Sequence, residues 1–241
     1  MLYAAISDVH SNLEALEAVL EDIGRRKVKS LLFLGDAVGY GPNPNECVSL
    51  LEERAKVLLA GNHDWAALGL TDISGFNPMA QAAILWTREV LTEEARKAIE
   101  GFSLVRNMGR QGMLLVHSSP FMPEEWHYVF TLSDAEENFR HFTQRICLIG
   151  HSHQPFIIER LPSGEMRVHR EEAALEKGNR YIINAGSVGQ PRDRDPRACY
   201  ALVGDGGARF VRVEYPVLET QRKMRDAGLP EPLIERLSHG M

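Results

Sequence analysis

Short apolar runs alternate along this chain with stretches that have polar side chains or helical spacing. Each run is three to five residues long and is followed by a glycine or a polar residue. Six runs can be recognised: residues 2–6, 31–34, 57–60, 113–116, 146–149 and 181–183. Runs of this kind are typical of strands covered on both faces, and strands that alternate with helices predict parallel βαβ units.

Helical spacing follows the first two runs and dominates the chain after the third. Apolar residues recur at helical intervals over residues 13–23, and the Asn43-Pro44 pair is typical of the start of a helix that continues to about Arg54. Residues 65–103 carry further helical patterns without a convincing strand, which predicts a helical insertion. The insertion either covers the mouth of a site at the strand ends or only packs against the domain.

The C-terminal half has a different pattern, because its apolar runs are separated by glycine-containing turns that predict mostly antiparallel strands. The last residues predict one or two exposed helices, broken at Gly228 and Pro230. No repeat or linker divides the chain. We therefore expect one domain over residues 1–241, with a helical insertion at about 65–103 and a helical tail at about 218–241.

The predicted strand ends carry side chains of the types that bind metal ions. These side chains are Asp8, His10, Asp36, Asn62, His117, His151 and His153. Ligands bind beyond the carboxyl ends of strands in open α/β sheets, so we expect one shared site. Oxygen and nitrogen ligands without sulfur suit Mn²⁺, Fe²⁺, Co²⁺, Ni²⁺ or Zn²⁺, and the imidazoles make Mg²⁺ or Ca²⁺ less suitable. The set is too large for one tetrahedral ion but suits two ions that share a carboxylate.

Two divalent ions and two aspartates would leave a charge of about +2, which favours an anionic substrate such as a phosphate ester. A hydroxide that bridges the ions could then attack phosphorus in line. The leaving oxygen needs a proton, and His63 is the best candidate because Asp64 could orient its ring and raise its pKa. A single histidine is more often a hydrogen-bonded residue than a metal ligand. The prediction of a metal site therefore depends on the recurrence of ligand-type residues at several strand ends.

Composition limits the function classes. The chain has 241 residues, a formal net charge of −6 and 44% apolar residues, which is typical of a globular protein without an extended nucleic-acid or membrane surface. Its three cysteines form no close pair, the N-terminus lacks the features of a signal peptide, and no apolar run reaches the roughly 20 residues that span a bilayer. A cytoplasmic location is expected.

The motifs that carry these side chains resemble those of the calcineurin-like metallophosphoesterase superfamily, whose pattern is D-x-H, G-D, G-N-H-[DE], H and G-H-x-H. In this chain they are Asp8-Val9-His10, Gly35-Asp36, Gly61-Asn62-His63-Asp64, His117 and Gly150-His151-Ser152-His153. The stretch from Asn184 to Arg192 is similar to the small prokaryotic phosphodiesterase branch. The resemblance implies an α/β (α+β) fold, a four-layer αββα sandwich of two mixed β-sheets flanked by helices.

The resemblance also implies a role for each side chain. One ion would be held by Asp8, His10, Asp36 and His153, and the other by Asp36, Asn62, His117 and His151. Asp36 would bridge the two ions, His63 would be the general acid and Asp64 would orient it. Among the suitable ions Mn²⁺ is favoured.

Two differences bear on the substrate. Serine/threonine protein phosphatases have a G-D-x-x-D-R-G block and an arginine after N-H-E, whereas this chain has Tyr40 and Trp65 in those regions. A dianionic monoester gains more from such arginines than a diester does, so we expect a phosphodiesterase for small, possibly nucleotide-type phosphoesters. The alternatives are a phosphomonoesterase or protein phosphatase, a dinucleoside polyphosphate hydrolase and a non-catalytic scaffold. Tyr40 and Arg192 or Arg194 either bind substrate or are solvated loop residues.

Overall fold

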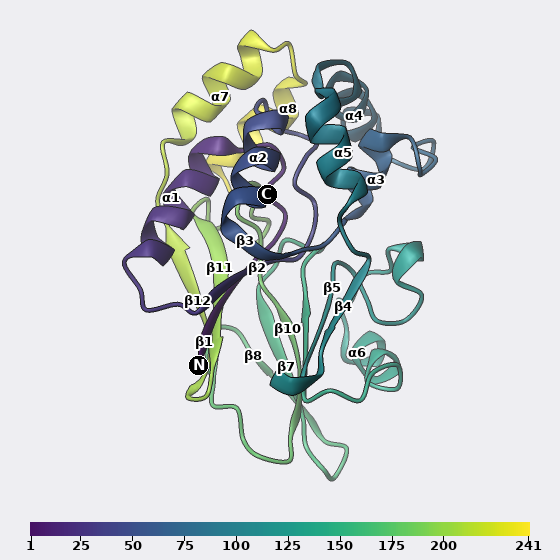
Figure 1. Ribbon diagram of the computed structural model, residues 1–241, viewed down its shortest axis with the longest axis vertical. Helices are drawn as coiled ribbons and strands as arrows, with labels where there is room; N and C mark the ends of the chain where they lie inside the picture. Colours follow the sequence, from purple (N-terminus) through teal and green to yellow (C-terminus); the bar gives the residue numbers. More distant parts are fainter.

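Two six-stranded mixed β-sheets form the centre of the computed structural model, which describes residues 1–241 (Figure 1). From edge to edge, the first sheet contains β3 (Ala55–Leu58), β2 (Ser30–Phe33), β1 (Leu2–Ile6), β11 (Ala198–Gly204), β12 (Gly207–Val213) and β9 (Glu172–Ala173). The second contains β4 (Val105–Met108), β5 (Met113–Val116), β6 (Ile146–Ile149), β10 (Arg180–Asn184), β7 (Phe156–Arg160) and β8 (Met166–His169). Strands β1 to β3 are parallel, as are β5, β6 and β10, and the other pairs are antiparallel.

Alternation along the strands divides the apolar core into layers. Tyr3 and Ala5 of β1 belong to a buried cluster that includes Leu115 of the second sheet, so the two sheets pack face to face. The alternate residues Ala4 and Ile6 belong to a different cluster, which contains helical side chains on the outer face of the first sheet. A third cluster lies on the outer face of the second sheet.

Helices cover both outer faces. Their bounds are α1 (Leu13–Gly24), α2 (Pro44–Arg54), α3 (Asn62–Leu68), α4 (Pro78–Val90), α5 (Glu93–Glu100), α6 (Leu132–Asn138), α7 (Val217–Asp226) and α8 (Glu231–Glu235). Short 3-10 turns are η1 (Gly109–Gln111), η2 (Pro123–Glu125) and η3 (Arg236–Ser238). Side chains of α1, α2 and α5 pack on the first sheet and those of α6 on the second, which confirms the predicted αββα sandwich. None of these helices has both the length and the apolar character needed to cross a bilayer.

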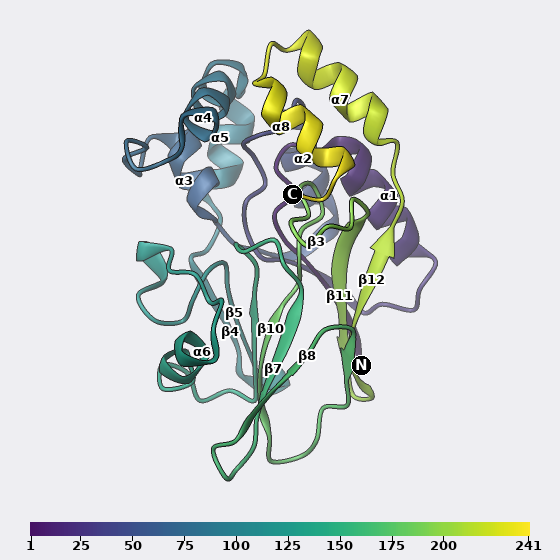
Figure 2. The same ribbon diagram turned by 180° about the vertical axis from the view of Figure 1, so that it is seen from behind.

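The insertion is helical, as its pattern predicts, although α3 begins within the Asn62-His63-Asp64 block rather than after it. Figures 1 and 2 show α3, α4 and α5 on the same side of the molecule as the loop between β5 and α6.

The predicted exposure of the C-terminal tail is wrong. Helix α7 lies beside α1, and α7 and α8 cover the end of the molecule to which the chain runs after β1 and β2 (Figures 1 and 2). Met224, Leu233 and Leu237 are buried in a cluster with Tyr40, and the Thr220 hydroxyl lies 2.9 Å from the Glu14 carboxylate. Charged residues recur along the tail, so its apolar side could not be recognised in the sequence. That side is buried only by packing against Tyr40 and the residues around it, which lie far from the tail in the sequence.

Candidate metal centre

Five parallel strands deliver the predicted metal-binding side chains to one end of the sandwich. Asp8 and His10 follow β1, Asp36 follows β2, Asn62 follows β3, His117 follows β5, and His151 and His153 follow β6. All seven side chains are buried. The carboxyl ends of strands from both sheets therefore converge on one site, as expected for ligand binding beyond parallel strands.

The side chains form two groups that share Asp36. The ligand atoms of Asp8, His10, Asp36 and His153 lie within 4.8 Å of one another, as do those of Asp36, His117 and His151. Asp36 Oδ2 lies 3.5 Å from His10 Nε2 and 3.4 Å from His117 Nε2. The same carboxylate oxygen is thus close to both groups.

Backbone carbonyls orient the imidazole rings. Nδ1 lies 3.1 Å from the Val38 carbonyl oxygen in His10, 2.9 Å from that of Leu34 in His117 and 2.6 Å from that of Gln190 in His153. Because a carbonyl oxygen only accepts, Nδ1 carries the hydrogen in each ring and the Nε2 lone pair faces the centre when the ring is neutral. Two such nitrogens, in His10 and His153, lie only 3.1 Å apart.

Unpartnered polar atoms show that the site fits metal ions. Asp8 Oδ1, Asn62 Oδ1, His117 Nε2 and His151 Nε2 are buried and have no hydrogen-bond partner. Buried polar atoms are normally paired, and unpaired ones are costly. The two oxygens and His151 Nε2 are electron-pair donors at one site, and His117 Nε2 becomes one when it loses its proton, so cations placed among the four atoms would satisfy all of them. The donor set fits divalent ions of the imidazole- and carboxylate-binding type.

The ionisation of the metal-free site is consistent with this fit. Burial lowers the pKa of His151 to about 3 and holds those of His10 and His153 well below their usual value, so these rings are neutral. Burial also opposes a charge on His117, but the Asp36 carboxylate outweighs it and raises the pKa of His117 to about 9. A proton on His117 therefore balances Asp36 in the free protein, and a metal ion must displace it.

Backbone strain is concentrated at the site. Five of its seven side chains belong to non-glycine residues with positive φ: Asp8 (54°), His10 (48°), Asp36 (59°), His151 (67°) and His153 (59°). Such conformations cost about 1 kcal/mol or more per residue and cluster at functional sites. Crowding adds a second restriction, since a Cβ at Gly61 would lie 2.0 Å from Asp36 Oδ1.

The loop after β10 buttresses the strand ends, although none of its side chains belongs to the two groups. The Ser187 hydroxyl and the Gly189 N–H donate to the Asp8 carbonyl oxygen at 2.8 and 2.9 Å. Asn184, the last residue of β10, donates from Nδ2 to the Gly150 carbonyl oxygen at 2.5 Å. The end of β10 and the loop after it therefore tie the residues after β1 to those after β6.

The predicted contact between Asp64 and the His63 ring is absent. The Asp64 carboxylate instead accepts hydrogen bonds from the backbone N–H groups of Gly61, Asp36 and Ala37 at 2.9 Å and of Val38 at 3.2 Å. Because both oxygens are occupied by backbone donors, Asp64 holds the loop that carries Asp36. Its role in the free protein is to position that loop.

We expect Asp64→Asn to destabilise the protein by about 3 kcal/mol, because the amide nitrogen cannot accept a hydrogen bond and would leave two of the four buried backbone N–H groups without a partner. For a domain of this size the melting temperature should fall by roughly 10 °C. Thermal unfolding of the metal-free protein measures the effect, with the exposed Glu53→Gln as control. A melting temperature equal to that of the control would contradict the positioning role.

His63 lies among aromatic rings rather than beside a carboxylate. Its ring centroid is 4.8 Å from that of His10, 4.5 Å from that of Tyr40 and 5.3 Å from that of Phe76. Burial lowers the pKa of His63 to about 4, which is opposite to the rise that a neighbouring Asp64 would cause. The imidazole is therefore neutral in the free protein.

Arg192 and Tyr40 lie beside the first group. The Arg192 guanidinium carbon is 5.7 Å from the centre of the Tyr40 ring, which in turn is 4.7 Å from the His10 ring. Arg192 donates to Gln190 Oε1 at 2.6 and 3.2 Å and forms no ion pair, so no carboxylate neutralises it. The Arg194 side chain makes no comparable contact. The backbone N–H of Arg194 donates to the Gly240 carbonyl oxygen.

Residues outside the motifs also reach the site. Tyr128 stacks on His151 with ring centroids 4.0 Å apart, and Trp126 lies 6.0 Å from His117. The aromatic density of residues 126–130 was the only sequence signal for these two contacts.

Known proteins resemble this chain over its whole length. A sequence model of the calcineurin-like phosphoesterase superfamily domain matches residues 1–204. An uncharacterized protein of Methanocaldococcus jannaschii is 40% identical over 243 residues, which cover 99% of this chain and 98% of the relative. The crystal structure of a metallophosphoesterase from Sphaerobacter thermophilus is 43% identical, with a TM-score of 0.88 and coverage of 100% of this chain and 99% of that one. A hypothetical protein from Pyrococcus horikoshii shares the fold, with 22% identity, a TM-score of 0.80 and coverage of 100% and 98%.

Proposed function

This chain belongs to the calcineurin-like phosphoesterase superfamily, and from that premise we propose that it hydrolyses a small phosphodiester with the help of two divalent metal ions. The observation that carries the proposal is the position of Asp36, whose Oδ2 lies 3.5 Å from His10 Nε2 and 3.4 Å from His117 Nε2. A carboxylate close to two groups of ligands can serve an ion in each group, as a two-ion site requires.

The expected ligand sets follow the two groups. Asp8, His10, Asp36 and His153 would hold one ion, and Asp36, Asn62, His117 and His151 the other. When bound, the ions would polarise the phosphoryl oxygens and lower the pKa of a water molecule that attacks phosphorus. We favour Mn²⁺ as the first ion to test, because carboxylate and amide oxygens suit it better than the softer ions.

The side chains around the centre would perform the remaining steps. The unpaired Arg192 guanidinium would attract the substrate phosphate, with Tyr40 beside it. His63 would give a proton to the leaving oxygen. Its pKa of about 4 in the free protein means that the ring must gain this proton as the phosphate anion binds, since an adjacent negative charge favours imidazolium.

A phosphomonoesterase is the second candidate, and Arg192 is the observation that favours it. A guanidinium without a carboxylate partner is suited to the additional negative charge of a monoester. The lack of a further arginine in the Asp36 and Asn62 motifs favours the diester.

One assay compares the two candidates. Protein stripped of metal and reloaded with Mn²⁺, Ni²⁺ or Zn²⁺ is given bis(4-nitrophenyl) phosphate and 4-nitrophenyl phosphate, which release the same leaving group. We expect kcat/KM to favour the diester by about ten-fold, which is roughly 1.4 kcal/mol of transition-state binding. A preference for the monoester would establish the second candidate. No turnover of either substrate with any of the ions would indicate a non-catalytic scaffold.

A further inference from the structure

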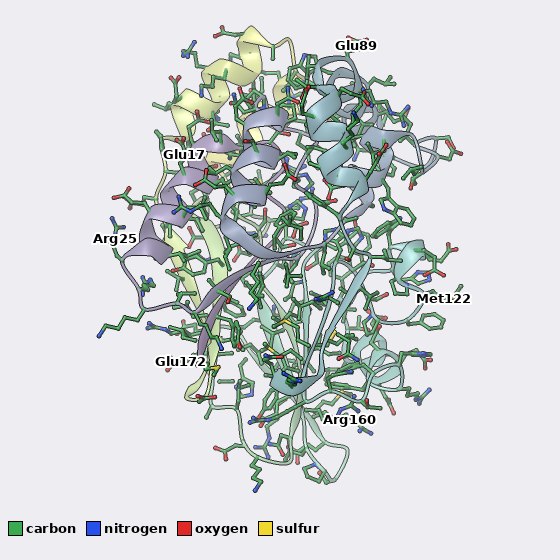
Figure 3. The ribbon with its side chains drawn as sticks, in the orientation of Figure 1. Glu17, Arg25, Glu89, Met122, Arg160 and Glu172 are labelled. Atoms are coloured by element: carbon green, nitrogen blue, oxygen red, sulfur yellow. The ribbon has the colours of Figure 1, made fainter.

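A cleft of about 400 Å³ opens beside the candidate metal centre, between the helical insertion and the loop that joins β5 to α6. Its inner end is lined by Asn62, His63 and His151, and its walls include Phe76 from the insertion and Trp126 from the loop. In Figure 3 the labelled Met122, from the same loop, lies at the edge of the molecule on this side. The volume is within the range of about 300–1,000 Å³ that small-molecule sites occupy.

Both walls contain aromatic side chains. Tyr128, which also lines the cleft, stacks on His151 at 4.0 Å and on Phe130 at 4.9 Å. Phe76 and Trp126 are half-buried: Phe76 packs against the cluster that contains Tyr40, but part of the surface of each side chain stays exposed. Aromatic surface of this kind remains available to a ligand.

Trp126 is held in place at a conformational cost. Its φ is 55°, which is uncommon for a bulky residue, and its ring packs edge-to-face against Trp65 at 5.1 Å. A strained backbone at a ligand-facing residue is typical of functional sites.

The polar lining of the cleft is acidic. Asp72 and Glu125 contribute carboxylates. Each Asp72 oxygen already accepts one hydrogen bond from Ser74, at 2.9 and 2.6 Å, and can accept a second, whereas the Glu125 carboxylate has no partner within the protein. Carboxylates accept hydrogen bonds from N–H donors and repel a second phosphate group. The cleft therefore suits an uncharged ring with N–H donors on its edge.

We propose that this cleft binds the leaving-group side of the substrate, and that it takes a planar aromatic base bearing amino groups, as in a nucleoside. Phe76 and Trp126 would pack against the base, and Asp72 and Glu125 would accept hydrogen bonds from its amino edge. The assignment of the leaving-group side rests on the proposed function, because it depends on the phosphate lying between the metal ions and His63. Binding of the base itself does not require turnover.

Calorimetry with the Mn²⁺-loaded protein tests the proposal, with two probes: adenosine 5′-monophosphate, and ribose 5-phosphate, which has a hydroxyl group in place of the base. We expect the nucleotide to bind about ten-fold more tightly, and Phe76→Leu or Trp126→Leu to remove most of this difference while ribose 5-phosphate binding is unchanged. Phe76→Tyr, which keeps the ring, should retain the difference. Phe210→Leu is the matched control, because Phe210 of β12 is half-buried like Phe76 and does not line the cleft.

Equal binding of the two probes by the unmodified protein would overturn the proposal. A difference in affinity that persists in both leucine variants would also overturn it, because the base would then bind elsewhere. An equal loss of affinity for both probes in each variant would overturn it too, because the two rings would then have only a structural role. Because calorimetry detects binding without catalysis, a failure here is distinguishable from a failure to hydrolyse diesters.

Discussion

Replacing Asp36 with asparagine should abolish hydrolysis and remove both metal ions rather than one. The Asp36 Oδ2 atom lies within 3.5 Å of a ligand nitrogen in each of the two groups. The substitution therefore removes a negative charge from both ion sites. We expect kcat/KM to fall on the order of 10³-fold or more, because both stabilisation of the phosphoryl charge and formation of the nucleophile depend on the ions. Metal content measured by mass spectrometry, together with diester turnover, gives the result.

Asp8→Asn is the matched control for this prediction. Asp8 belongs to one group only, so this variant should keep about one ion per chain while Asp36→Asn keeps almost none. The fold should survive in both, because an asparagine oxygen can still accept the His63 N–H that Asp36 Oδ1 accepts and the His151 N–H that Asp8 Oδ2 accepts. Two retained ions in the Asp36 variant would exclude a bridging role.

The second large effect is expected for His63→Gln, and its size should depend on the leaving group. A proton donor matters when the leaving oxygen is a poor leaving group, so kcat for a dialkyl diester should fall about 10²–10³-fold. With bis(4-nitrophenyl) phosphate the fall should be less than about ten-fold, because nitrophenolate needs no proton. Steady-state rates for the two substrates, measured on one protein preparation, supply the comparison.

Metal content should be unchanged in the His63 variant, since His63 belongs to neither ligand group. The same substitution at the exposed His127 should leave both rates unaltered. If hydrolysis of the two diesters slowed by the same factor, His63 would position the phosphate and another group would supply the proton. Loss of a metal ion from the variant would identify His63 as a metal ligand.

Much of the candidate site could be predicted because its positions are tied to local patterns. Apolar runs of strand length ended at Asp8, Asp36, Asn62, His117 and His151, and strands of this kind place their carboxyl ends at one edge of a sheet. Glycine at position 61 was required because a side chain there would collide with Asp36. The pattern predicted parallel βαβ units followed by mostly antiparallel strands, and the resemblance of the motifs to the calcineurin-like superfamily supplied the αββα sandwich.

The partners of individual side chains could not be predicted in the same way. Asp64 was assigned to its neighbour His63, but its carboxylate binds the backbone of a loop 28 residues earlier. The contact between Asp64 and His63 was suggested by their adjacency in the sequence. Because α3 begins at Asn62, however, the two consecutive side chains point in different directions from the helix.

The sequence by itself determined the order of strands and helices and the seven side chains at the strand ends, because apolar periodicity and the sites of strand termination are local properties. Only the tertiary structure decided that the tail covers Tyr40, that Asp64 binds the Asp36 loop, and that Phe76 and Trp126 line the same cleft. These contacts join segments far apart in the chain. Such contacts are stabilised when two surfaces from separate segments meet and remove each other from water. The sequence of one segment therefore does not reveal which surface will cover it.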